Sequence, residues 1–252
     1  METENKKAFE TSAKLYDILY GDKDYTKEAE FVEEQFGKDK SLKILEIGCG
    51  TGNYLKAFLN KGYDISGVDI SKEMLEVARK KCNCELYQGD MRDFKIEKKF
   101  DVILIMFDVL SYVNENEGIV KTLQNVREHL NENGKLIFLV WNGLAVLSDP
   151  RGEGIREIEK ENVKVIRKFT PVLKANKQVV EAHFKYWLID KESNKIIQET
   201  EEIHPMRIFF PQEIKYFLET NGFRVKTMSD FMDVNKPVDE KAFGLFCVAE
   251  KV

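Results

Sequence analysis

Short runs of apolar and β-branched residues alternate with amphipathic stretches over the first 142 positions of the chain. The short runs predict strands at 43–47, 64–68, 85–88, 100–107 and 135–141. The stretches between them predict helices at 54–59, 72–81 and 117–130, the last followed by a turn at 131–134. Because this alternation is typical of βαβ crossovers, it predicts a mainly parallel sheet.

The pattern changes on both sides of that region. Ahead of it, 6–18 and 25–36 are predicted helices that cap the sheet, with Phe9, Ala13, Tyr16 and Tyr20 at helical spacing. After Trp141, strands predicted at 163–170, 178–189 and 195–209 follow one another without helical spacers, which indicates an antiparallel meander. The charged mixture at 157–164 is expected to be a solvated face.

The last forty residues return to the α/β pattern. A helix is expected from Pro211 to the Asn221-Gly222 pair, followed by strands at 224–228 and 244–249. The chain as a whole therefore predicts an α/β fold, a doubly wound, mainly parallel sheet of seven strands with an antiparallel β insertion. We expect a helical N-terminal cap at 1–40, the α/β domain at 41–150 and 209–252, and the insertion, a lid or the surface of a homodimer, at 151–208.

Composition and charge narrow the class. With 252 residues, 43% of them apolar, the chain buries a full core, which excludes a disordered protein. The longest apolar runs, 102–107 and 136–141, fall far below the roughly 20 residues of a membrane span. The 39 basic and 44 acidic residues form no basic tail, so no nucleic acid is expected. The polar N-terminus predicts a cytoplasmic protein with reduced cysteines.

A glycine-rich turn follows the first strand. Gly48, Gly50 and Gly52 allow close approach of the backbone to a ligand. Their spacing differs from the dinucleotide fingerprint G-x-G-x-x-G, whose last glycine would fall on Asn53. Glu46, just before the turn, would repel a phosphate and attract a cationic group. The turn therefore predicts a ligand with a positive charge rather than a pyrophosphate.

Two further carboxylates follow the next two strands. Asp69 ends the second strand, where a carboxylate is well placed to accept from both hydroxyls of a ribose. After the third strand, Asp90 is suited to accept from an adenine amino group and Met91 to pack on the base. Since parallel strands end at one edge of the sheet, the three acids are expected to face one crevice.

This ordered set, the glycine turn with Glu46, then Asp69, then Gly89-Asp90, resembles the class I S-adenosylmethionine-dependent methyltransferases over residues 40–142. The resemblance implies a Rossmann-like methyltransferase fold, with S-adenosylmethionine as cofactor and its methionine end against the 46–52 turn. The cofactor-binding residues it implies are Tyr16, Tyr25, Glu46, Gly48, Cys49, Gly50, Gly52, Asn53, Asp69, Ile70, Met74, Gly89, Asp90, Met91 and Met106.

Finer details are similar to the N-methyltransferases that act on nucleotide-linked amino sugars. They are the stretch 88–94, Met106-Phe107, Ser111-Tyr112, the tyrosine-rich stretch 16–25, and 204–209 before Pro211. The sequence departs from that group at Tyr112, where some members carry histidine, and at 140–143, where some carry an acidic, Trp-rich segment. The resemblance implies methyl transfer to a small-molecule amine.

Fewer residues of the sequence point to the site that would bind the methyl acceptor. His204, Tyr112 and Tyr16 are candidate catalytic bases, expected to converge near the transferred methyl group. Asp108, Tyr112, Trp141 and Arg207 are candidate substrate contacts. No metal is expected, because Asp108 lacks further oxygen ligands and Cys82-Asn83-Cys84 lacks a second pair. Methylation of tRNA or protein, and a cofactor-binding subunit without turnover, remain alternatives.

Overall fold

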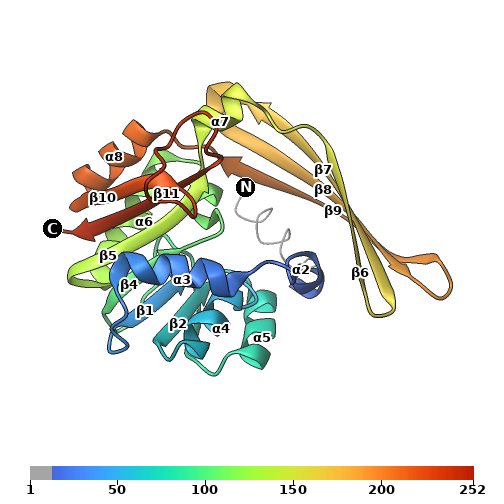
Figure 1. The fold of residues 1–252 in the computed structure, drawn as a ribbon, viewed down its shortest axis with the longest axis horizontal. Coiled ribbons are helices and arrows are strands. Elements are labelled where there is room, and N and C mark those ends of the chain that lie inside the picture. The colour runs from blue at the N-terminus through green and yellow to red at the C-terminus, as the bar shows by residue number, and fades with distance from the viewer. Residues whose placement is uncertain (1–12) are drawn as a thin grey trace.

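A computed structural model describes residues 13–252 and shows two β-sheets (Figure 1). The larger sheet has seven strands, in the order β10 (Phe223–Asp230), β11 (Gly244–Lys251), β5 (Leu130–Trp141), β4 (Phe100–Ile105), β1 (Lys43–Ile47), β2 (Asp64–Asp69) and β3 (Leu86–Gln88). Strands β1 to β5 pair in parallel, and β11 is antiparallel to both of its neighbours. The predicted doubly wound, seven-stranded sheet is confirmed.

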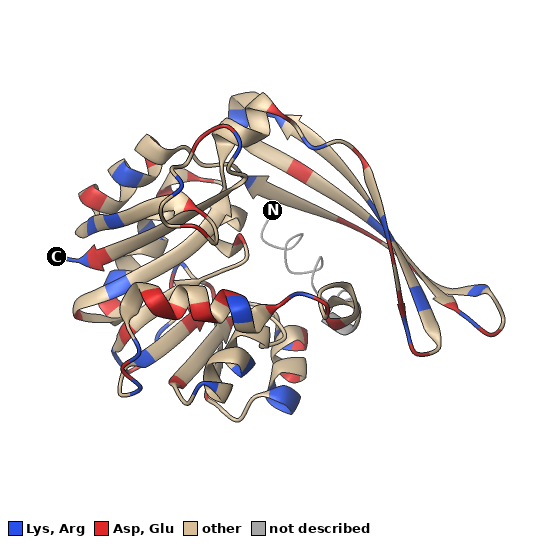
Figure 2. Cartoon of the chain, viewed as in Figure 1, with Lys and Arg blue, Asp and Glu red and all other residues tan. Residues whose placement is uncertain are grey.

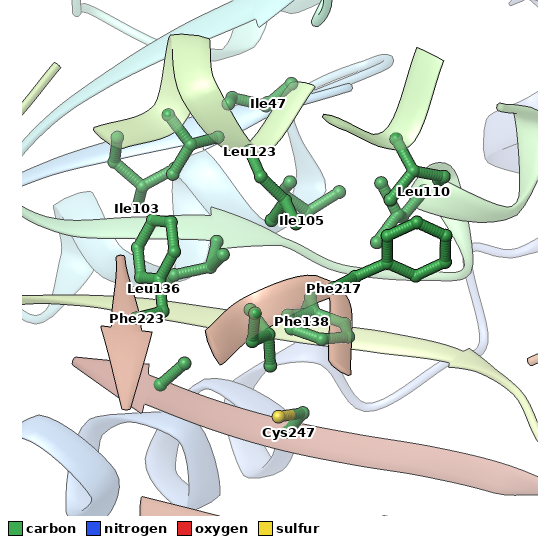
Figure 3. Packing of buried hydrophobic residues seen from close by; sticks show 14 of the residues in the cluster. Ile47, Ile103, Ile105, Leu110, Leu123, Leu136, Phe138, Phe217, Phe223 and Cys247 are labelled. Atoms are coloured by element: carbon green, nitrogen blue, oxygen red, sulfur yellow. The ribbon is translucent and has the colours of Figure 1, made fainter. Parts of the chain in front are cut away.

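Helices cover both faces of this sheet. One face carries α3 (Tyr25–Phe36), α4 (Asn53–Asn60) and α5 (Lys72–Lys81), and the other carries α6 (Asn116–His129) and α8 (Pro211–Thr220). Side chains alternate between the faces, so Ile44 packs with α3 to α5 whereas Leu45 packs with α6 and α8. Figure 3 shows the cluster on the side of α6 and α8, which includes Phe138 of β5 and Phe217 of α8. Burial on both sides explains the unbroken apolar runs of the central strands.

Local capping fixes the ends of two helices that the sequence predicted to the residue. The Asp24 carboxylate accepts from the backbone N–H of Lys27 at 3.0 Å, at the start of α3. The Ser71 hydroxyl accepts from the N–H of Met74 at 3.1 Å, at the start of α5. Both side chains satisfy a backbone donor that has no partner inside its helix.

The second sheet is the predicted antiparallel insertion, and it has one strand more than predicted. Its order is β6 (Gly154–Lys160), β7 (Val163–Lys174), β8 (Val179–Asp190) and β9 (Lys195–Arg207), with the short helix η2 (Ala175–Lys177) between β7 and β8. The charged stretch 157–164 is therefore the edge strand β6 and its turn into β7, not only a solvated face. Charged residues suit an edge strand because they oppose further strand pairing.

Two other boundaries differ from the prediction, and two short helices were not predicted. Strand β4 ends at Ile105 because Phe107 and Asp108 take left-handed φ values of 56° and 63°. The turn predicted at 131–134 is an irregularity inside β5, with a shift of register and a φ of 61° at Asn133. The short helices η1 (Val109–Tyr112) and α7 (Gly143–Ser148) have too few residues to show a periodic pattern.

Helix α2 (Ala13–Leu19) packs between α5 and the second sheet (Figure 1). Its Leu15 and Leu19 pack with Val165 of β7 and Tyr186 of β8. Of the two predicted caps, α3 therefore covers the seven-stranded sheet, and α2 fills the angle between the sheets. The first part of the helix predicted at 6–18, with Phe9, lies outside the described residues.

The chain enters and leaves the insertion at one place. The N–H of Phe209 donates to the carbonyl of Trp141 at 2.9 Å, and the N–H of Gly143 donates to the carbonyl of Phe209 at 2.7 Å. Between them, the fully buried Asn142 side chain donates to the carbonyls of Asp239 and Ala242, both at 2.7 Å, and accepts from the N–H of Leu144 at 3.1 Å. Asn142 thus ties the start of the insertion to the C-terminal region.

No helix within residues 13–252 is long and apolar enough to cross a membrane. Figure 2 shows Lys and Arg interspersed with Asp and Glu on the helices and on the antiparallel sheet.

Replacing Asn142 should weaken the whole fold. In Asn142→Ala, three hydrogen bonds of a fully buried side chain are lost, and the carbonyl of buried Ala242 loses its side-chain donor, so the free energy of unfolding should fall by about 2–4 kcal/mol. Urea unfolding followed by circular dichroism measures this. Asn221→Ala, which removes a part-buried bond to the carbonyl of Phe217 and a long, exposed one to the hydroxyl of Thr220, is the control and should cost about 1 kcal/mol. Equal losses in the two variants would contradict the role given to Asn142.

Candidate active site

A cavity of about 980 Å³ lies between the two sheets. Its floor is formed by the turns that follow β1 to β4, and its other walls come from α2 and from the inner face of β7, β8 and β9. The order of the large sheet reverses between β1 and β4, where connections leave to opposite faces and open a crevice at the carboxyl ends of the strands. The fold therefore places the cavity where α/β proteins bind ligands.

Most of the predicted cofactor residues surround this cavity. Those lining it are Tyr16, Gly48, Gly50, Asp69, Ile70, Met74, Gly89, Asp90 and Met91. A small pocket of about 40 Å³ shares Tyr16, Gly48 and Gly50 with the large cavity. Its lining includes five other predicted residues: Tyr25, Glu46, Cys49, Asn53 and Met106. Gly52 lines neither space, and a Cβ there would lie 2.9 Å from the sulfur of Cys82, so its role is packing against the end of α5.

The glycine turn is held by Asp69. One carboxylate oxygen of Asp69 accepts from the N–H of Gly50 at 2.7 Å, and the other accepts from the N–H of Ser71 at 2.8 Å. Gly48 has a φ of 71°, and a Cβ on it would lie 2.3 Å from a methyl carbon of Val109. A side chain at position 48 would be strained by this φ and would also collide with Val109. Backbone therefore forms the wall of the cavity at this turn.

Glu46 is a buried acid of the site with an unsatisfied oxygen. Its side chain is 3% exposed, and its Oε2 has no hydrogen-bond partner among the described residues. Burial, and after it the nearby charge of Asp69, raise the pKa of Glu46 well above its usual range. A buried carboxylate oxygen without a partner, at the wall of a pocket, fits a ligand with an ammonium group. The methionine end of S-adenosylmethionine has such a group.

Asp90 already has an internal partner. The guanidinium of Arg92 donates from Nε to Oδ1 of Asp90 at 2.9 Å, and the N–H of Arg92 donates to the same oxygen at 2.9 Å. The pair lies on the wall of the cavity beside Met91. Arg92 therefore fixes the orientation of the Asp90 carboxylate, which would be the group that contacts an adenine.

Two of the candidate bases are hydrogen-bonded to each other. The hydroxyl of Tyr112 lies 2.8 Å from Nδ1 of His204, although 92 positions separate the two residues. Tyr16 lines the same cavity, with its ring 4.7 Å from that of Tyr20. The structure thus brings Tyr112 and His204 together and places Tyr16 in the same space.

Asp108 and Trp141, predicted substrate contacts, also line the cavity. Burial raises the pKa of Asp108 to about 7, against the opposing effects of a hydrogen bond from Trp141 and the charges of Lys23 and Arg151. Phe107 and Asp108 both have left-handed φ values, which are strained in residues other than glycine. Backbone strain next to a buried acid is a frequent feature of functional sites.

Arg207 lies outside the cavity, although it was expected to contact the substrate. Its guanidinium donates to the carbonyl of Asn114 at 3.2 Å and to the side chain of Asn116 at 2.7 Å, and it forms an ion pair with Glu213. These bonds tie the end of β9 to the segment that follows η1 and to α8. A basic residue near a predicted site cannot be assigned from sequence to the ligand or to such a network.

Several lining residues were not singled out from the sequence. The ammonium of Lys23 lies 3.9 Å from the ring centre of Phe107 and pairs with Glu28 at 3.0 Å. Arg92, Arg151, Arg167 and Glu202 also line the cavity. For Glu202 a signal was available, since it is two positions from His204 on a strand and so lies on the same face. Within the described part of the chain, no three His, Cys, Asp or Glu side chains are grouped to hold a metal ion.

Comparisons with known proteins agree with this geometry. Residues 44–134 match the family described as a methyltransferase domain. A dTDP-3-amino-3,4,6-trideoxy-alpha-D-glucopyranose N,N-dimethyltransferase of Streptomyces venezuelae is 26% identical over 219 residues, which cover 85% of this chain and 90% of that protein.

Solved structures share the fold over nearly the whole chain. An S-adenosylmethionine-dependent methyltransferase from Clostridium acetobutylicum has a TM-score of 0.80 at 23% identity, covering 96% of this chain and 98% of its own. DesVI of Streptomyces venezuelae has a TM-score of 0.79 at 23% identity, and the match covers 95% of this chain and 98% of that protein. The resemblance to class I S-adenosylmethionine-dependent methyltransferases is thus confirmed.

Removing the charge of Glu46 should weaken cofactor binding. Glu46→Gln keeps the shape of the side chain but loses a charge-assisted bond to an ammonium, so the affinity for S-adenosylmethionine should fall about 10-fold to 100-fold. Isothermal titration calorimetry measures it. Glu76→Gln, an exposed change on α5, is the control and should bind as the wild type does. An unchanged affinity in Glu46→Gln would show that this carboxylate does not bind the cofactor.

Asp108 should make the stability of the ligand-free protein depend on pH. Its pKa is raised from 3.8 to about 7, so the folded state holds one proton more than the unfolded state between these values. The free energy of unfolding should therefore fall as the pH rises through this window, by about 2–3 kcal/mol between pH 5 and pH 8. Asp108→Asn should lose this part of the pH dependence. Denaturant unfolding of the wild type and of Asp108→Asn at pH 5 and pH 8 tests this prediction. If the two proteins differed in free energy of unfolding by the same amount at both pH values, the assignment to Asp108 would be contradicted.

Proposed function

We propose that the protein transfers methyl groups from S-adenosylmethionine to the amino group of a nucleotide-linked sugar. The observation that carries this proposal is one continuous cavity, which reaches from the glycine turn and Asp69 to the Tyr112–His204 pair. Cofactor and acceptor can thus occupy one continuous space. A cavity between the two sheets, with the antiparallel sheet as one wall, favours a small acceptor over a tRNA or a protein.

The cofactor side uses residues whose chemistry matches the parts of the ligand. Glu46 would bind the ammonium, Asp69 the ribose hydroxyls, and Asp90 with Met91 the adenine. When bound, S-adenosylmethionine supplies a methyl group that is already activated for transfer. The chain therefore has mainly to hold the amine in line with that methyl group, and such positioning can supply about 7–11 kcal/mol of the barrier.

The acceptor side must remove a proton from the amine, because an ammonium has no lone pair for attack. Burial raises the pKa of both Tyr16 and Tyr112 well above the usual range of tyrosine, so neither phenol acts as a phenolate near neutral pH. His204, hydrogen-bonded to Tyr112, is then the group that takes the proton. Tyr16 would shape the pocket.

Two observations support a nucleotide-linked amino sugar as the acceptor. The Streptomyces venezuelae relative, matched over 90% of its length, acts on a dTDP-linked amino sugar according to its name. In this chain, Arg151 and Arg167 line the cavity, and guanidinium groups suit phosphate oxygens. We also propose that 41–150 and 209–252 hold the cofactor and that 151–208 encloses the acceptor.

Two wider expectations belong to the same proposal. The reaction would take place in the cytoplasm, which is consistent with four cysteines that are all free thiols. The insertion would also form a homodimer, for which the exposed Ile196, Ile197 and Ile203 on the edge strand β9 are suitable.

Labelled S-adenosylmethionine offered with a panel of acceptors tests the proposed function. We expect label in dTDP-linked amino sugars, identified by mass spectrometry, because the cavity offers a base beside the amine. The matched control is the same nucleotide sugar with a hydroxyl in place of the amino group, which should stay unlabelled. Transfer only to tRNA or protein, or equal transfer to the hydroxyl analogue, would refute amine methylation of a small molecule.

A further inference from the structure

A buried carboxylate stands behind the His204–Tyr112 pair. Oε2 of Glu202 lies 3.1 Å from Nε2 of His204, while Nδ1 of the same ring lies 2.8 Å from the hydroxyl of Tyr112. Glu202 and His204 are each 6% exposed. Their positions, two apart on β9, place both side chains on the face that lines the cavity.

We propose that Glu202 is a positioning residue that fixes the tautomer of His204, so that the proton of the acceptor amine passes through Tyr112 to this ring. The proposal rests on the proposed function, amine methylation, and adds to it the residue that directs the proton. Glu202 itself does not touch the reacting atoms.

The tautomer follows from the chemistry of the three groups. A carboxylate only accepts hydrogen bonds, so Nε2 of His204 must donate to Glu202. A neutral imidazole carries one proton, which leaves Nδ1 as the acceptor for the hydroxyl of Tyr112. Tyr112 lines the cavity, and its hydroxyl oxygen can then accept a proton while its own proton leaves toward His204.

The proton path balances at each atom. An N–H bond of the ammonium breaks and an O–H bond forms at Tyr112. The original O–H bond of Tyr112 breaks and an N–H bond forms at Nδ1 of His204. The amine gains its lone pair, Tyr112 ends neutral, and His204 becomes an imidazolium whose charge Glu202 offsets. When the product leaves, the imidazolium returns its proton to water.

The surroundings of Glu202 suit this role better than a purely structural one. Its second oxygen, Oε1, is buried and has no hydrogen-bond partner among the described residues. A buried carboxylate satisfied at one oxygen is costly, and an apolar side chain would pack at lower cost. Across the strands, Glu202 faces Phe184 and His204 faces Ala182. An imidazolium at position 204 would supply the charge that compensates Glu202.

Other titratable groups near the relay come from four elements. Around Tyr112 they are Tyr20 of α2, Asp108 and Tyr186 of β8. Arg167 of β7 lies close to Tyr186 and donates to the hydroxyl of Tyr20 at 3.0 Å. A change at Glu202 leaves these groups in place, so a shift in pH dependence can be assigned to the Glu202–His204 pair.

Glu202→Gln tests the relay by kinetics. It keeps the shape but removes the charge, so we expect kcat to fall about 100-fold or more while the affinity for S-adenosylmethionine stays within about twofold. The rise of kcat with pH should move to lower pH, because loss of the carboxylate favours the neutral ring. A structural role would lower activity without moving this limb. Glu201→Gln, which faces away and pairs with Lys185, is the matched control and should behave as the wild type does.

Tyr112→Phe separates the relay from general damage to the site. It cuts the path between the cavity and His204, so adding Glu202→Gln to it should change kcat no further. Additive losses, or a Glu202→Gln variant with wild-type kcat and pH profile, would overturn the inference and leave amine methylation standing. A wild-type protein that methylates no amine would instead overturn the proposed function.

The tautomer can be read in the unmodified protein without any acceptor. The chain has three histidines, so the ring nitrogens are few enough to assign in a ¹⁵N-labelled sample. The expected spectrum of His204 near neutral pH shows the proton on Nε2. A proton on Nδ1 in the neutral ring would overturn the proposal even if every variant failed to fold.

Discussion

The structure depends on the hydrogen bonds that join the two ends of the insertion to each other, at Trp141 and Phe209. Because Trp141 and Phe209 are hydrogen-bonded at the base of the insertion, the chain makes its excursion and returns to the same point beside β5. A sheet held at that point must extend over the carboxyl ends of the parallel strands, and its inner face becomes a wall of the cavity. The 2.8 Å contact between Tyr112, which follows β4, and His204, on β9, follows from this closure.

Burial disfavours the ionised form of three acids at the site. Glu46, Asp69 and Asp108 all have a pKa raised first by burial. Each ionised form is costly until a ligand supplies a compensating group. The site therefore selects ligands that bring positive charge or hydrogen-bond donors, and both the cofactor and an amine acceptor do so.

The sequence predicted well those features that local chemistry decides. Strand β1 and helix α5 matched to the residue, because an apolar run and a serine cap are both readable from neighbouring positions. Strand β6 was missed because an exposed edge strand carries the charges of a solvated loop. Arg207 was assigned to the substrate, and its partners Asn116 and Glu213 appear only once the chain has folded. The link from Glu202 to Tyr112 likewise depends on tertiary contacts.

The contact between Gly48 and Val109 limits how this cavity can evolve. Val109 lines the cavity, and its methyl carbons fill the space where a side chain at position 48 would stand. A larger residue at 109 would press on the glycine turn, whereas a smaller one would widen the cavity and leave the turn in place. Substitutions at position 109 that change the choice of acceptor are therefore expected only toward smaller side chains. The chain can gain room for bulkier acceptors here, but it cannot lose room without harm to the cofactor side.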